Sequence, residues 1–176
     1  FMDRRMFLAV SSAALGAAAL PLPAFAADGA PLLAPWTGPY GGVPAFDKVK
    51  VADFAPALEA AMAEELAEVE AIANNPEPAT FENTIAALER SGAASERVSM
   101  FYGVWGATLS TPEMREVQTA MAPKLSAHGD AILQNAKLFA RIEAVYEGRE
   151  SAGLTPEQQR LAWKGWNRFV RAGAKL

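Results

Sequence analysis

His128 is the side chain best suited to chemistry, because it is the only histidine of the 176-residue chain. It belongs to an apolar stripe that repeats at steps of three and four residues: Met114, Val117, Met121, Leu125, His128 and Ile132. A zinc pair on one helix needs a second histidine four residues away, but those positions hold Lys124 and Ile132. A di-iron site in a helical bundle needs a glutamate three residues earlier, where Leu125 stands. We expect a buried or half-buried, hydrogen-bonded histidine, with a ligand or partner contact as the alternative.

Carboxylates are the second group that could do chemistry, because paired carboxylates can act as acid and base. They crowd one predicted helix, at Glu59, Glu64, Glu65, Glu68 and Glu70. Most of them fall opposite the apolar stripe that runs from Phe54 to Ile72, and no counter-group of fixed geometry accompanies them. We therefore expect a solvated helix face, and an acid–base site is the alternative.

Aromatic side chains form two groups that could cage a ligand or stack on bases. The first group holds Phe101, Tyr102 and Trp105, and the second holds Trp163, Trp166 and Phe169. With 20 acidic and 16 basic residues the formal net charge is −4, so the basic groove that nucleic acid needs is missing. Helical spacing makes core packing the expectation for both groups, and no nucleic-acid partner is expected.

Composition removes several further classes of site. The chain has no cysteine, which excludes a disulfide scaffold, a thiolate zinc site, an iron–sulfur cluster and a cysteine nucleophile. No glycine-rich phosphate loop, Ser-x-x-Lys motif or nucleophile elbow occurs in the sequence. We predict no catalytic, cofactor-binding or metal-binding residue in this chain.

Residues 1–26 have the parts of an export signal. Arg4 and Arg5 give a positive head, an apolar stretch runs from Phe7 to Leu20, and a small-x-small site predicts cleavage after Ala26. The paired arginines indicate the twin-arginine export machinery, and an ordinary secretory signal is the alternative. The apolar stretch is shorter than the roughly 20 residues of a spanning helix, so no stable membrane span is expected. The predicted location is the periplasm or another exported compartment.

The remaining residues divide into a lead-in at 27–50 and a helical part at 51–176. Prolines at 31, 35, 39 and 44 predict an extended, turn-rich lead-in without helix. Caps and apolar periodicity then predict about six helices, near 51–73, 81–91, 93–109, 112–133, 136–147 and 156–172. Because no alternating strand pattern of useful length occurs, the predicted fold class is all-α.

Several runs of residues resemble the zinc metallopeptidase family of thimet oligopeptidase, oligopeptidase A and bacterial peptidyl-dipeptidase. The runs keep the family's order through the chain: 31–33 (PLL), 44–50 (PAFDKVK), 80–85 (TFENTI), 87–92 (ALERSG), 121–128 (MAPKLSAH), 138–141 (LFAR), 153–161 (GLTPEQQRL) and 169–173 (FVRAG). The first and last runs look most like the peptidyl-dipeptidase (dipeptidyl carboxypeptidase) branch. Ala45 and the pair Ala52-Asp53 depart from the family's usual residues.

The resemblance implies a two-lobed, all-α peptidase that removes dipeptides from the carboxyl end of short, unstructured peptides. Its zinc is held by a His-Glu-x-x-His motif and a later glutamate, and no such motif occurs in this chain. The resemblance therefore implies the N-terminal part of a longer enzyme, truncated at its C-terminus, which builds channel wall and binds no zinc itself. The stripe Trp163, Trp166 and Val170 is then expected to lack its partner helices.

Two other classes of protein remain open from the sequence. One is a stand-alone exported helical bundle that binds a peptide or a protein without catalysis. The other is a structural domain of an envelope assembly. An in-frame His-Glu-x-x-His motif beyond codon 176 would favour the peptidase, whereas a stop codon would favour a binding module.

Overall fold

The computed structural model describes residues 30–39 and 42–175. The predicted signal at 1–26, including Arg4, Arg5 and the cleavage site after Ala26, lies outside the described residues. Within the described part the fold is all-α, as predicted, and the strand-like pairing there is one isolated bridge between Thr37 and Val43. No helix in residues 30–39 and 42–175 is long and apolar enough to cross a membrane.

The lead-in is a chain of tight turns. It contains a one-turn helix α1 (Ala30–Leu33) and two short 3-10 turns, η2 (Phe46–Lys48) and η3 (Val51–Asp53). The expectation that prolines exclude helix here is wrong at α1. Pro31 lies in the first turn, where the missing N–H would have no helical partner in any case. The buried side chain of Leu32 and a hydrogen bond from Arg97 Nη2 to the carbonyl of Leu33 (3.0 Å) hold α1 against the rest of the molecule.

The six predicted helical segments are present. They are α2 (Phe54–Ala73), η4 (Phe81–Ala86) continuing into α3 (Ala87–Arg90), α4 (Ala93–Thr108), α5 (Pro112–Leu133), α6 (Ala136–Gly148) and α7 (Pro156–Arg171). Their starts follow from local chemistry. Thr111, Asn135 and Thr155 each accept a hydrogen bond from a backbone N–H three residues on, which satisfies one of the unpaired donors of the first turn. The second segment differs from a plain α-helix, because its first part, η4, is a π-helix.

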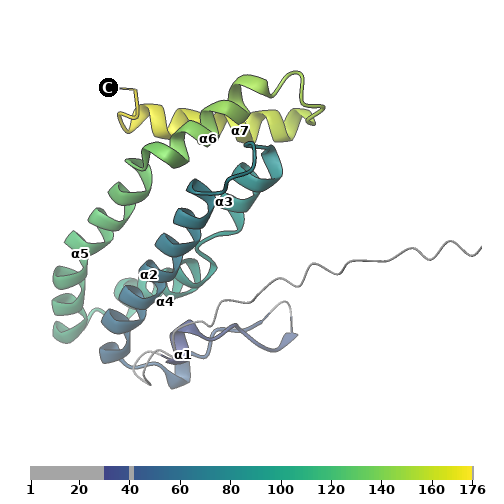
Figure 1. The fold of residues 1–176 in the computed structure, drawn as a ribbon. Helices are drawn as coiled ribbons and strands as arrows, with labels where there is room; N and C mark the ends of the chain where they lie inside the picture. The colour runs from purple at the N-terminus through teal and green to yellow at the C-terminus, as the bar shows by residue number, and fades with distance from the viewer. Residues whose placement is uncertain (1–29, 40–41, 176) are drawn as a thin grey trace, which may run out of the picture.

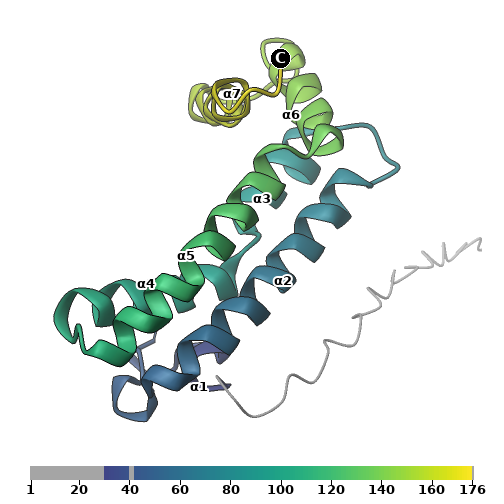
Figure 2. The ribbon, with the colours of Figure 1, turned by 90° about the vertical axis from the view of Figure 1, so that its left-hand side faces the viewer.

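The helices form an elongated assembly with α2 at its centre. α2 and α5 run side by side, α6 and α7 lie at one end, and α1 lies at the other end beside α4 (Figures 1 and 2). Two apolar clusters fill the two ends. The first cluster is made by the lead-in, by α4, by α5 and by the first half of α2. Its buried side chains include Phe54, Leu58, Phe101, Met114 and Met121. The second is made by the last part of α2, η4, α6 and α7, with Val69, Ile85, Leu138, Ile142 and Phe169. Helix α2 therefore ties both clusters into one scaffold.

Candidate functional site

His128 lies on α5 and faces Glu65 of α2. Its Nε2 atom is 2.9 Å from Glu65 Oε2, and the two side chains are 11% and 20% exposed. The histidine is thus half-buried and hydrogen-bonded, in a contact between residues 63 positions apart. Its other ring nitrogen, Nδ1, is buried without a hydrogen-bond partner among the described residues.

This pair belongs to a polar layer between the two apolar clusters. On α2, Met62 belongs to the first cluster and Val69 to the second, and Glu65 lies between them. One turn further, Glu68 Oε2 accepts a hydrogen bond from the backbone N–H of Gly92 at 2.7 Å. Gly92 has a positive φ of 74°, and a Cβ at this position would lie 2.7 Å from Glu65 Oε1. The layer therefore requires glycine where α3 turns into α4.

The expected solvated carboxylate face is only partly present. Glu59 and Glu70 are exposed, and Glu59 pairs with Lys124 on the surface. Glu65 and Glu68 are instead half-buried and hydrogen-bonded, so the expectation is wrong for these two residues. The reason is that Glu65 follows Met62 by three residues and precedes Val69 by four, so it lies on the buried side of α2, which α4 and α5 cover.

The polar layer offers limited chemistry. A carboxylate that holds a histidine can orient it as a base, but a general base must also lie within hydrogen-bond reach of the substrate proton that it removes. Among the described residues there is no group of three or more His, Cys, Asp or Glu side chains that could hold a metal ion. The pair joins α5 to α2 across 63 positions of sequence, and we assign it to positioning these two helices.

Members of both aromatic groups pack against other aromatic side chains, in agreement with the core packing that the helical spacing predicts. Phe54 meets Tyr102 and Trp105 edge-on, at 5.9 and 5.6 Å between ring centroids. Trp166 stacks on Tyr146 at 4.3 Å. The expectation that Trp166 lacks a partner is therefore wrong, whereas Trp163 is 41% exposed.

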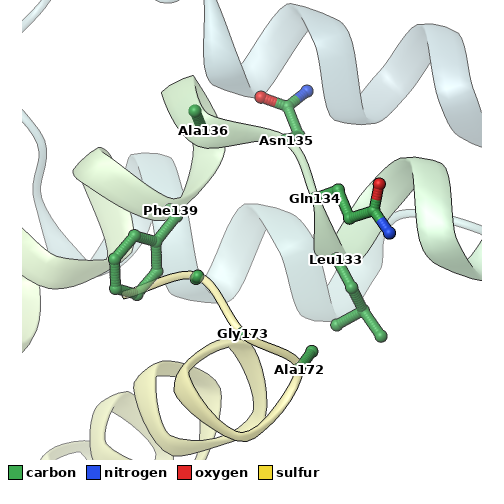
Figure 3. Close-up of a pocket in the computed structure, with 8 residues that line it drawn as sticks. Leu133, Gln134, Asn135, Ala136, Phe139, Ala172 and Gly173 are labelled. Atoms are coloured by element: carbon green, nitrogen blue, oxygen red, sulfur yellow. The ribbon is translucent and has the colours of Figure 1, made fainter. Parts of the chain in front are cut away.

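A hollow of about 430 Å³ lies where the junction of α5 and α6 meets the end of α7 (Figure 3). Neutral residues line it: Leu133, Gln134, Asn135, Ala136, Phe139, Ala172, Gly173 and Ala174. Beyond it, Lys175 Nζ lies 2.7 Å from Glu143 Oε1, and this hydrogen bond is the main reason that the pKa of Glu143 is lowered. The hollow itself has amide groups and no titratable side chain, so it is unsuited to acid–base chemistry.

Comparison with known proteins connects this scaffold to a peptidase. No family model matches the chain. The dipeptidyl carboxypeptidase of Salmonella typhimurium is 38% identical over 133 residues, which are 76% of this chain and 20% of that protein. The dipeptidyl carboxypeptidase of Escherichia coli is 38% identical over 146 residues, which are 83% of this chain and 21% of that protein.

The resemblance to the dipeptidyl carboxypeptidases is confirmed. The chain spans about a fifth of the length of these curated dipeptidyl carboxypeptidases. The matched residues are 76% and 83% of the chain, so the similarity extends over most of its sequence.

Sequence reasoning missed the partners of the polar layer. It treated Glu65 and Glu68 as members of one helix face, and it gave no partner for His128. Helical periodicity shows which side of a helix is apolar, but it does not show which residue of another helix lies opposite. A glutamate close to the middle of α2 and a histidine on the apolar stripe of α5 were the available signals.

Proposed function

We propose that this chain is part of an exported, zinc-dependent peptidase that removes dipeptides from the carboxyl end of short, unstructured peptides. The observation that carries the proposal is the 38% identity to two proteins named dipeptidyl carboxypeptidase. Because the chain spans about a fifth of their length, we place the catalytic centre and its zinc in sequence outside these 176 residues.

The role proposed for this part is to form wall of the substrate channel. A wall that excludes folded proteins must be stiff, and rigid helices position sites better than loops do. The two apolar clusters joined by α2, and the caps at the helix starts, support a stiff element of this kind. In this proposal, peptide bonds are hydrolysed by residues outside these 176, in a channel that these helices help to enclose.

Reading the gene beyond codon 176 tests the proposal. We expect an in-frame continuation that encodes a His-Glu-x-x-His motif, because two histidines four residues apart on one helix can hold zinc beside a glutamate that activates water. A continuation without the motif, or a stop codon at this point, would contradict the proposal.

The His128–Glu65 pair provides a test of the structural role assigned to it. Replacing His128 with glutamine is expected to lower the free energy of unfolding by about 1–2 kcal/mol, since it disturbs a hydrogen bond between two largely buried side chains. Urea unfolding of His128→Gln, Glu65→Gln and the double variant measures the coupling between the two residues. Zinc content of the longer protein should not change. A longer His128→Gln protein that folds normally but loses its metal would overturn the structural role.

Export gives a separate prediction. Replacing Arg4 and Arg5 by lysine is expected to trap the precursor in the cytoplasm, because the twin-arginine machinery reads that pair. Fractionation of cells and N-terminal sequencing of the wild-type product check it, and the mature protein should begin at Ala27. Normal periplasmic yield of the double-lysine variant through the general secretory route would show that the twin-arginine assignment is wrong.

A further inference from the structure

One face of α7 carries an unusual concentration of positive charge. Arg160, Lys164, Arg168 and Arg171 are all exposed, and Glu157 is the one acidic residue of this helix. With 100° between successive residues, these four cations, Trp163 and Asn167 fall within about 140° of the helix circumference. Together these six residues define the basic face of α7. It occurs in a chain whose formal net charge is −4.

The cations of the basic face have no acidic partner in the described part of the chain. The ion pairs found among residues 30–39 and 42–175 involve other cations, namely Arg90, Lys124, His128, Arg149 and Lys175. Like charges one turn apart lower the stability of a helix. The helix dipole favours cations in the last turn, which accounts for Arg168 and Arg171 but not for Arg160 and Lys164.

A shallow groove lies on the basic face of α7. The groove has a volume of about 360 Å³ and is lined by Trp163, Lys164, Asn167, Arg168 and Arg171. The ring of Trp163 offers an apolar contact beside three cations and one amide. A carboxylate-bearing side chain could bind two of the cations while an apolar neighbour covers the indole.

The opposite face of α7 packs against the rest of the protein. Ala162 and Phe169 are buried in the second apolar cluster, against α6 and η4. A helix that binds a membrane surface inserts its apolar face, and that face is not free here. A nucleic acid would meet basic charge on one helix only, in a chain of negative net charge. An acidic polypeptide segment fits the small size and the mixed chemistry of the groove better than either of these.

We propose that the basic face of α7 docks an acidic helix from the part of the longer polypeptide that lies outside these 176 residues. This proposal rests on the proposed function only for the existence of that longer polypeptide, of which this chain is about a fifth by comparison with its relatives. The helix presents carboxylates one turn apart to Lys164 and Arg168, and an apolar side chain to Trp163. Docking would neutralise the cations that have no acidic partner among residues 30–39 and 42–175.

Binding of a synthetic acidic helix tests the chemistry of the surface. The probe is a fluorescent peptide of about 18 residues with glutamates at i, i+4 spacing and leucine between them. By fluorescence anisotropy at low salt, we expect the double variant Lys164→Glu, Arg168→Glu to bind at least about tenfold more weakly than wild type. The double variant Lys48→Glu, Lys50→Glu changes the net charge equally on an exposed surface elsewhere and should change binding less than about twofold. Trp163→Ala should weaken binding by about threefold or more.

Several results of this experiment would overturn the proposal. One is no binding of the probe, and another is equal weakening by the two charge-reversal variants. A third is tighter binding of single-stranded DNA or of vesicles with anionic lipid than of the probe. A fourth is a dimer of the wild-type chain that the α7 variant abolishes, because the occupant would then be a second copy. Circular dichroism of each variant shows whether it is folded. The milder double variant Lys164→Gln, Arg168→Gln removes the two charges without reversing them, so it separates a loss of binding from a loss of folding.

Labelling of lysines in the longer polypeptide tests the source of the helix. Acetylation of Lys164, followed by mass spectrometry, should be at least about tenfold slower in the longer protein than in this chain, and Arg168→Glu should restore it. Equal labelling in both proteins, or a gene that ends at codon 176, would show that the docking helix is not part of the same polypeptide. A longer gene without His-Glu-x-x-His would contradict the proposed function but would leave this inference intact.

Discussion

Replacing Phe101 with alanine is expected to lower the free energy of unfolding by about 3–5 kcal/mol, because a large buried ring is lost and a cavity remains. Phe101 is 1% exposed, and its ring centroid lies 4.7 Å from that of Phe46 and 6.0 Å from that of Trp36. These two partners belong to the lead-in. The substitution should therefore also loosen the contact between the lead-in and α4, which urea unfolding and limited proteolysis would both detect.

The neighbouring residue supplies the control for this prediction. Met100 lies on the same helix but is 47% exposed, so Met100→Ala should change the stability by no more than about 0.5 kcal/mol. Equal losses for Phe101→Ala and Met100→Ala would show that the first apolar cluster is not packed as described.

Removing the side chain of Arg141 is expected to have the second large effect. Its Nη1 atom donates to the carbonyl oxygens of Asn75 (2.8 Å) and Glu77 (2.9 Å), and its Nη2 atom donates to Asn83 Oδ1 (2.9 Å). These bonds hold the connection between α2 and η4 against α6. Arg141→Ala leaves the acceptors without this donor, and we expect a loss of about 2–4 kcal/mol in the free energy of unfolding.

Two further variants separate the geometry of Arg141 from its charge. Arg141→Lys keeps the charge but loses the planar fork, so its stability should fall between those of wild type and Arg141→Ala. Arg90→Ala removes an exposed arginine that pairs with an exposed glutamate, and it should cost no more than about 1 kcal/mol. Full stability of Arg141→Lys would mean that charge alone holds the connection.

Helix positions could be predicted from the sequence because their signals are local. The prediction that Thr111 and Pro112 begin a helix and that Leu133 ends it is confirmed in α5, since a cap and a proline act within one turn. The exceptions have local causes too. Pro31 is compatible with the first turn of α1, and the first part of the second segment adopts a π-helix that apolar periodicity does not distinguish from an α-helix.

Contacts between helices could not be predicted in the same way. Glu65 and His128 are 63 positions apart, and Gly92 and Glu68 are 24 positions apart. Each residue could be assigned to a polar or an apolar helix face, but the pairing depends on how α2, α4 and α5 are placed against one another. The fold class and the resemblance to the dipeptidyl carboxypeptidases were therefore accessible from the sequence, whereas the polar layer required the structure.

Release of dipeptides from the carboxyl end of a short peptide tests most directly where the catalytic centre lies. The assay uses purified 176-residue chain and the longer gene product, each with added zinc and then with a chelator. We expect no release above the protein-free rate from the 176-residue chain, because its one histidine cannot supply a two-histidine zinc site. We expect chelator-sensitive release from the longer product. Chelator-sensitive release by the 176-residue chain alone, or none by the longer product, would contradict the proposal that these helices serve a zinc peptidase whose centre lies beyond them.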